Sequence, residues 1–153
     1  MTEDSTGEYL RDELAIRSLV ARYSNAVCCD DISEWRTTWS QDGIWSLLGN
    51  THEGQNAIVT HFQNVTRSLE AVIQHPHGGM ISFEKNGRAT GRWSMTEYAR
   101  MASDGAALLT IGLYDDVYIP VNSQWLFAER AFSVLYMGPP DLSSPFQPAP
   151  SSS

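Results

Sequence analysis

The chain has little cysteine, few positive charges and no long apolar run, and each shortage excludes a class of protein. Its two cysteines, Cys28 and Cys29, are adjacent. Neighbouring side chains on a helix point about 100° apart, so these two are poorly placed to bond to each other. The sequence therefore has no disulfide framework, and its cysteine spacing fits no zinc site.

The charge balance excludes another set of partners. Lys and Arg number 10 against 18 Asp and Glu, which gives a formal net charge of −8 at pH 7. Without a basic cluster we expect no nucleic-acid partner. No apolar run approaches the roughly 20 residues that span a bilayer, and residues 1–9 are polar and acidic. We therefore expect a cytoplasmic protein with no membrane partner.

What the chain does have is enough apolar and aromatic residues for one packed domain. Of its 153 residues 42% are hydrophobic, with five Trp, six Tyr and five Phe. A chain of this length buries about two-thirds of its unfolded surface. We expect a flexible N-terminus over residues 1–9, one folded domain over 10–138 and a Pro/Ser-rich tail over 139–153.

Helical periodicity comes first in the chain and strand alternation follows. The pattern predicts helices over residues 9–27, 34–39 and 55–69, a short strand over 44–48, and longer strands over 73–83, 87–100, 106–119 and 125–136. This order predicts an α+β fold: a cone-shaped, curved antiparallel sheet wrapped by three N-terminal helices around a central apolar pocket. Ala89, Gly91, Trp93 and Met95 give one strand an apolar face.

Five polar residues are candidates for acid–base chemistry. His75 and His77 begin the predicted sheet at i, i+2 spacing, which places them on one side, and imidazole titrates near neutral pH. They could instead be surface or edge histidines. Tyr23 could donate to a substrate oxygen or be a core tyrosine. Asp30 or Asp31 could orient an imidazole or only shape the turn. Two histidines alone do not make a metal site, and we predict no metal.

Other residues are candidates for binding the substrate. Arg130 shares a predicted apolar face with Leu126, Ala128 and Phe132, where a charge is costly unless it is paired. It would bind a substrate carboxylate or oxyanion, or pair with an internal acid such as Asp115. Large apolar residues that belong to the core or line the cavity are Trp39, Trp45, Phe62, Trp93, Met95 and Tyr114.

Over residues 10–136 the chain resembles the SnoaL-like branch of the nuclear-transport-factor-2-like superfamily. The similar segments are 16–23, 35–39, 86–93, 112–116 and 125–130. That superfamily includes ketosteroid isomerase, scytalone dehydratase, bile-acid dehydratase, limonene epoxide hydrolase and a hexachlorocyclohexane dehydrochlorinase. The Ala-Thr-Gly-Arg-Trp run at 89–93 is most similar to the dehydratases.

The resemblance implies a catalytic set of Tyr, Asp and His. Tyr23 falls at the tyrosine position. Without gaps, the Asp position falls on Cys28 and the His position on Gln74, with His75 beside it. Asp31 falls at a second acid position of the family, and His77 matches a second histidine of some dehydratases.

The leading hypothesis is a cofactor-independent acid–base enzyme, a dehydratase (lyase) or double-bond isomerase acting on an apolar, cyclic small molecule. In it, His75 or His77 is the base, Asp30 or Asp31 orients the base, and Tyr23 is the donor. The alternatives are a non-catalytic binding protein on the same fold, or an epoxide hydrolase built on Arg92 or Arg130 with Asp115. The resemblance also implies a homodimer or homotrimer.

Overall fold

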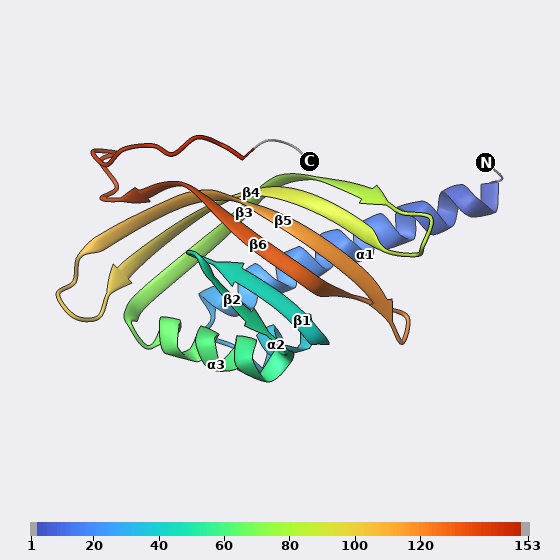
Figure 1. Cartoon of the computed structure of the whole chain (residues 1–153), viewed down its shortest axis with the longest axis horizontal. Coiled ribbons are helices and arrows are strands. Elements are labelled where there is room, and N and C mark those ends of the chain that lie inside the picture. The colour runs from blue at the N-terminus through green and yellow to red at the C-terminus, as the bar shows by residue number, and fades with distance from the viewer. Residues whose placement is uncertain (1–2, 151–153) are drawn as a thin grey trace.

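Helices and two shorter strands precede the long strands of the sheet (Figure 1). The structure is a computed structural model, and it describes residues 3–150. Its elements are α1 (Glu3–Cys28), α2 (Ile32–Thr37), β1 (Trp39–Leu47), β2 (Asn50–Glu53), α3 (Gln55–Thr66), β3 (Leu69–Phe83), β4 (Ala89–Met101), β5 (Ala107–Val121) and β6 (Gln124–Gly138). The predicted α+β class is confirmed.

The sheet is curved and open. Its strands lie in the order β2-β1-β6-β5-β4-β3. Neighbours are antiparallel, as predicted, except that β1 pairs with β6 in parallel. Figure 1 shows the long strands β3–β6 bending over the helices. A concave sheet face closed by helices is the arrangement that makes room for an internal site.

An aromatic cluster joins the helices to the concave face. Trp35 of α2 stacks on Phe62 of α3, with ring centroids 4.0 Å apart. Tyr23 of α1 and Trp39 of β1 pack on Phe127 of β6 at 5.4 and 5.5 Å. All five side chains are at most 4% exposed. Burying rings of this size is a major part of the hydrophobic stabilisation of a small domain.

A β-bulge in β6 makes the facing of its side chains differ from the prediction. Val117 pairs with Glu129 but Tyr118 pairs with Phe127, so Ala128 is an extra residue on β6. Phe127 and Arg130 are consequently both buried on the inner face, although strict alternation placed them on opposite faces. The bulge brings Arg130 under the helices.

At one end of the described chain α1 begins early, and at the other the C-terminal tail contacts the sheet. α1 begins at Glu3 and covers most of the segment that we expected to be flexible, while residues 1–2 lie outside the described residues. Residues 139–150 form no helix or strand but fold back on β6: the Tyr136 hydroxyl donates to the Pro139 carbonyl at 2.6 Å, and Gln147 N–H donates to the Leu135 carbonyl at 2.7 Å. Within residues 3–150, no helix combines the length and apolarity needed to cross a membrane.

Candidate active site

A cavity of about 220 Å³ lies between the helices and the concave face of the sheet. Side chains from α1, α3, β1 and β3–β6 line it, and most of them are apolar. The polar lining residues are Tyr23, Thr66, Ser68, Gln74, Glu97, Thr110 and Tyr114. A largely apolar cavity with a few converging polar groups is the usual form of a small-molecule site.

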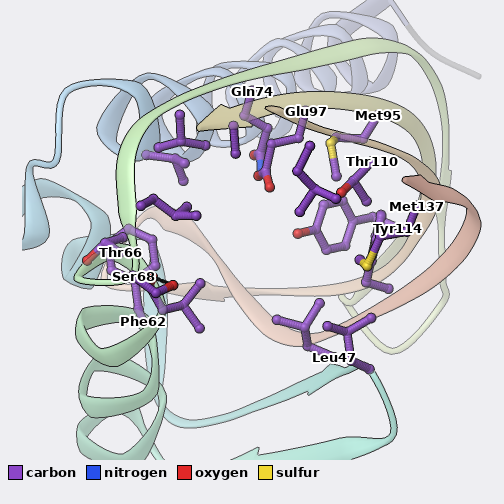
Figure 2. Close-up of a pocket in the computed structure, with 18 of the residues that line it drawn as sticks. Leu47, Phe62, Thr66, Ser68, Gln74, Met95, Glu97, Thr110, Tyr114 and Met137 are labelled. Atoms are coloured by element: carbon purple, nitrogen blue, oxygen red, sulfur yellow. Dashed lines mark hydrogen bonds between the residues drawn. The ribbon is translucent and has the colours of Figure 1, made fainter. Parts of the chain in front are cut away.

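Glu97 is the one carboxylate among the described lining residues. On β4 it lies opposite Gln74 of β3 and Thr110 of β5, so three polar side chains cross the inner face in one row. Figure 2 shows Gln74 and Glu97 pointing into the cavity. Burial raises the pKa of Glu97 above its ordinary 4.5, and the hydrogen bond from Gln74 opposes that rise. Such a carboxylate is a stronger base than one in water.

A hydrogen-bonded chain fixes the Glu97 carboxylate. The Ser24 hydroxyl of α1 donates to Gln74 Oε1 at 3.0 Å, which orients the amide so that Nε2 donates to Glu97 Oε2 at 2.9 Å. Cys28 holds the same strand, because Gln74 N–H donates to its Sγ at 3.2 Å. One carboxylate oxygen is therefore bonded, and no hydrogen bond to the other is recorded among the described residues.

Two tyrosines provide hydroxyl groups near Glu97. Tyr23 and Tyr114 share a hydrogen bond, and both line the cavity. Figure 2 shows the Tyr114 hydroxyl pointing to the centre of the cavity. Burial raises the pKa of the Tyr114 phenol well above 10, and the charge of Arg130 opposes that rise. The phenols stay protonated at neutral pH and act as hydrogen-bond donors.

Arg130 lies beneath these tyrosines as a buried cation. Its Cζ is 3.8 Å from the Tyr114 ring centroid and 4.2 Å from that of Tyr23. Its guanidinium donates to both oxygens of Asp116, at 2.8 and 3.0 Å, and both side chains are at most 1% exposed. The Tyr118 hydroxyl also donates to Asp116, at 2.7 Å. The alternative that Arg130 pairs with an internal acid is confirmed, but the acid is Asp116. Asp115, the example given from the sequence, lies on the opposite face and pairs with Arg92 at 2.6 Å.

The structure does not bring the predicted histidine–aspartate pair together. Gln74 faces inward, so the next residue of the strand, His75, faces outward. The His75 ring packs edge-on against the Tyr98 ring. His77 is exposed and shares a hydrogen bond with Thr96 at 2.9 Å. Asp31 caps α2 by accepting from Glu34 N–H.

Asp30 also lies apart from both histidines. It is exposed in the turn after α1, with φ at 51°. No hydrogen bond or ion pair joins either histidine to Asp30 or Asp31, all of which are among the described residues. Cys28 and Gln74, the ungapped positions of the pair, are the residues in contact.

The predicted substrate-binding residues divide into two groups. Trp45, Phe62, Met95 and Tyr114 line the cavity. Trp39, Trp93 and Arg130 are buried behind it, and Trp93 Nε1 donates to the Tyr118 hydroxyl at 2.7 Å. The residue that the sequence interpretation missed is Glu97. Its signal was present: it continues the inward alternation of Trp93 and Met95 and puts an acid on an apolar face.

A second polar feature lies next to the cavity wall. His52 of β2 stacks on His61 of α3 with ring centroids 3.8 Å apart, and Trp45 packs on His61 at 5.5 Å. Among the described residues, no group of three or more His, Cys, Asp or Glu side chains could hold a metal. Burial, and then the charge of His52, lowers the pKa of His61 below 6.5.

This histidine pair predicts an acid-sensitive fold. Because the folded-state pKa of His61 is lowered, its contribution to stability is complete above the unfolded pKa and is lost as the pH falls below about 6.5. His61→Gln should therefore reduce the drop in Tm between pH 7.5 and pH 5. Thermal unfolding followed by circular dichroism measures this, with the exposed His77→Gln as control. An equal drop in both variants would contradict the prediction.

A curved sheet and N-terminal helices that enclose a cavity of this kind define a cone-shaped α+β fold. The chain belongs to the SnoaL-like domain family, whose model matches residues 8–131. Comparison with curated protein sequences finds no match.

Solved structures repeat the fold at low sequence identity. A scytalone dehydratase-like protein from Novosphingobium aromaticivorans is 17% identical with a TM-score of 0.83, covering 97% of this chain and 99% of that one. A type 2 hexachlorocyclohexane dehydrochlorinase is 18% identical with a TM-score of 0.81, covering 92% and 95%. A type 3 dehydrochlorinase from Novosphingobium barchaimii is 17% identical with a TM-score of 0.80, covering 93% and 97%.

Proposed function

We propose that this chain is a cofactor-independent acid–base enzyme that abstracts a proton from an apolar, cyclic small molecule, with Glu97 as the base. The observation that carries the proposal is a partly buried carboxylate of raised pKa facing an apolar cavity beside the Tyr114 hydroxyl. An apolar site tunes acids and bases without a metal or organic cofactor.

The proposed reaction uses two groups of this chain. Glu97 takes a proton from the carbon next to a carbonyl, and the carbonyl oxygen becomes negative. Tyr114 donates a hydrogen bond to that oxygen, backed by the positive charge of Arg130. Protonated Glu97 then returns the proton to another carbon, which shifts a double bond. In the elimination branch it gives the proton to the hydroxyl on the β-carbon instead: that C–O bond breaks, water leaves, and the enolate electrons form the new C=C bond. A dehydratase-like protein and dehydrochlorinases among the structural neighbours support the elimination branch.

The same geometry disfavours the epoxide hydrolase alternative. That chemistry needs two acids and an arginine around the substrate, whereas Glu97 is the single carboxylate in the described lining. Arg92 and Asp115 pair on the other face of the sheet, and Arg130 and Asp116 are bonded to each other in the core.

Deuterium exchange tests the proposal without knowledge of the natural substrate. The protein is incubated in D2O with a panel of cyclic ketones and enones, and deuterium beside the carbonyl is followed by NMR. We expect exchange above the buffer rate for at least one ring compound, and its loss in Glu97→Gln. Exchange at the buffer rate for every compound would contradict the proposal, as would full exchange in the variant.

Tyr114→Phe tests the proposed donor. Removing a hydrogen-bond donor to a developing oxyanion costs about 10²–10³-fold in kcat. Because Tyr23 keeps a hydroxyl beside the same site, we expect a loss near the lower end of that range. The measurement is the exchange rate at saturating ketone, with Tyr136→Phe, outside the cavity lining, as the control. An unchanged kcat in Tyr114→Phe would remove this residue from the mechanism.

A further inference from the structure

The turn between β1 and β2 contains a leucine in an unfavourable conformation. Leu48 and Gly49 have φ angles of 51° and 80° and join the paired residues Leu47 and Asn50. A two-residue hairpin turn with both φ angles positive favours Asn, Asp or Gly. Leucine at the first position brings its Cβ close to the neighbouring carbonyl oxygen, which is unfavourable. Leucine is therefore not at this position to stabilise the turn.

The same leucine is also exposed. Leu48 is 55% exposed to solvent, yet it is one of the residues that line the cavity. The Asn50 side-chain amide donates to the Leu48 carbonyl at 3.3 Å, which holds the turn in place. The backbone of Leu48 is strained, and its side chain is exposed to solvent beside the cavity. This side chain would gain contacts when a ligand fills the cavity. Strain of this kind concentrates at functional sites.

The cavity has a polar wall and an apolar wall. Figure 2 shows Leu47, from the β1–β2 hairpin, across the cavity from Gln74 and Glu97. A ligand whose oxygen meets Glu97 and the Tyr114 hydroxyl therefore directs its opposite end toward Leu47 and Leu48. A cavity of about 150 Å³ accommodates benzene. The cavity here, about 220 Å³, has room for one ring with a short substituent.

We propose that Leu48 covers the apolar end of the bound substrate, and that the substrate is a small oxygenated ring with an alkyl group opposite the oxygen. The position of the oxygen rests on the proposed function, whereas the role of Leu48 rests on the hairpin and the cavity. Leu48 is then a specificity-determining residue that selects for the length of that group.

Calorimetric binding of phenol, 4-ethylphenol and 4-propylphenol tests the proposal. A phenol hydroxyl can accept from Tyr114 and donate to Glu97, as an enol intermediate would. In the unaltered protein each buried methylene should tighten binding by roughly three- to fourfold. In Leu48→Asn the gain per methylene should fall below about twofold, because the covering side chain is lost. The Tm should rise by about 2–4 °C, because asparagine suits the turn.

Leu142→Asn is the matched control. Leu142 also has a positive φ, 62°, and is 47% exposed, but it is not among the cavity-lining residues. Its substitution should raise the Tm similarly and leave the gain per methylene unchanged. The proposal is overturned if the phenols do not bind, if their affinity is independent of chain length, or if Leu48→Asn keeps the full gain.

Two further variants separate this proposal from the proposed function. Glu97→Gln and Tyr114→Phe should weaken all three phenols by a common factor and keep the gain per methylene. If they leave every affinity unchanged, the polar end of the proposed function fails, while the dependence on Leu48 still supports the apolar cover.

Discussion

Glu97→Gln is expected to lower kcat for proton abstraction by about 10²–10⁴-fold, the range that a positioned general base contributes. The substitution preserves shape and leaves the aromatic cluster untouched, so the loss would report on the carboxylate itself. The pH profile gives an independent check. Glu97 acts as a base only when ionised, so kcat/KM should rise with pH through a pKa above the ordinary 4.5.

The same substitution should make the protein more stable at neutral pH. The folded-state pKa of Glu97 is raised, so its contribution to stability is complete below the unfolded pKa and is lost as the pH rises through the folded value. At pH 7 the charged carboxylate therefore opposes folding, and a neutral amide removes that cost. A higher Tm with a lower kcat is the usual sign of a destabilised active site.

Glu129→Gln is a suitable control, because Glu129 is exposed on β6 and pairs with Arg88 at the surface. It should change neither kcat nor its pH profile. If Glu97→Gln retains more than a tenth of the unaltered kcat, which is less than the loss expected of a general base, Glu97 is not the base. The binding-protein alternative would then explain the cavity better.

The fold was accessible from sequence because it depends on periodicity. The alternation of Ala89, Trp93 and Met95 predicted an inward apolar face on β4, and all three side chains are buried. The same rule places Glu97 on the inward face of β4, whereas residue type alone favours the two histidines as titratable groups. Inward alternation was the better guide to this carboxylate than residue type.

The site was less accessible because it depends on register. The chemistry of imidazole predicts His75 as the base, yet a shift of one residue in a strand reverses the facing, and Gln74 takes the inward position. The β6 bulge at Ala128 has the same effect on Arg130 and Phe127. No local pattern in β6 signals an extra residue, because the bulge is defined by pairing with β5. Side-chain facing beyond such a point requires the structure.

Arg130→Met is the second large prediction, and its main effect should be on stability. Removing one partner of a buried ion pair leaves an uncompensated charge and costs about 3–5 kcal/mol. Asp116 would keep only the hydrogen bond from Tyr118 among its recorded side-chain partners. At about 2–4 °C per kcal/mol for a domain of this size, we expect the Tm to fall by about 10 °C.

A double variant separates the charge from the packing. Arg130→Met with Asp116→Asn removes both charges, so it should recover a large part of the lost Tm, because the penalty comes from the unpaired carboxylate. Arg92→Met is the control on the outer face, where the pair with Asp115 is partly exposed and its loss should be much smaller. If the double variant were no more stable than Arg130→Met, the cation would be stabilising mainly through the Tyr23 and Tyr114 rings. Cation–π contact, and not the ion pair, would then be the reason for a buried arginine beneath the site.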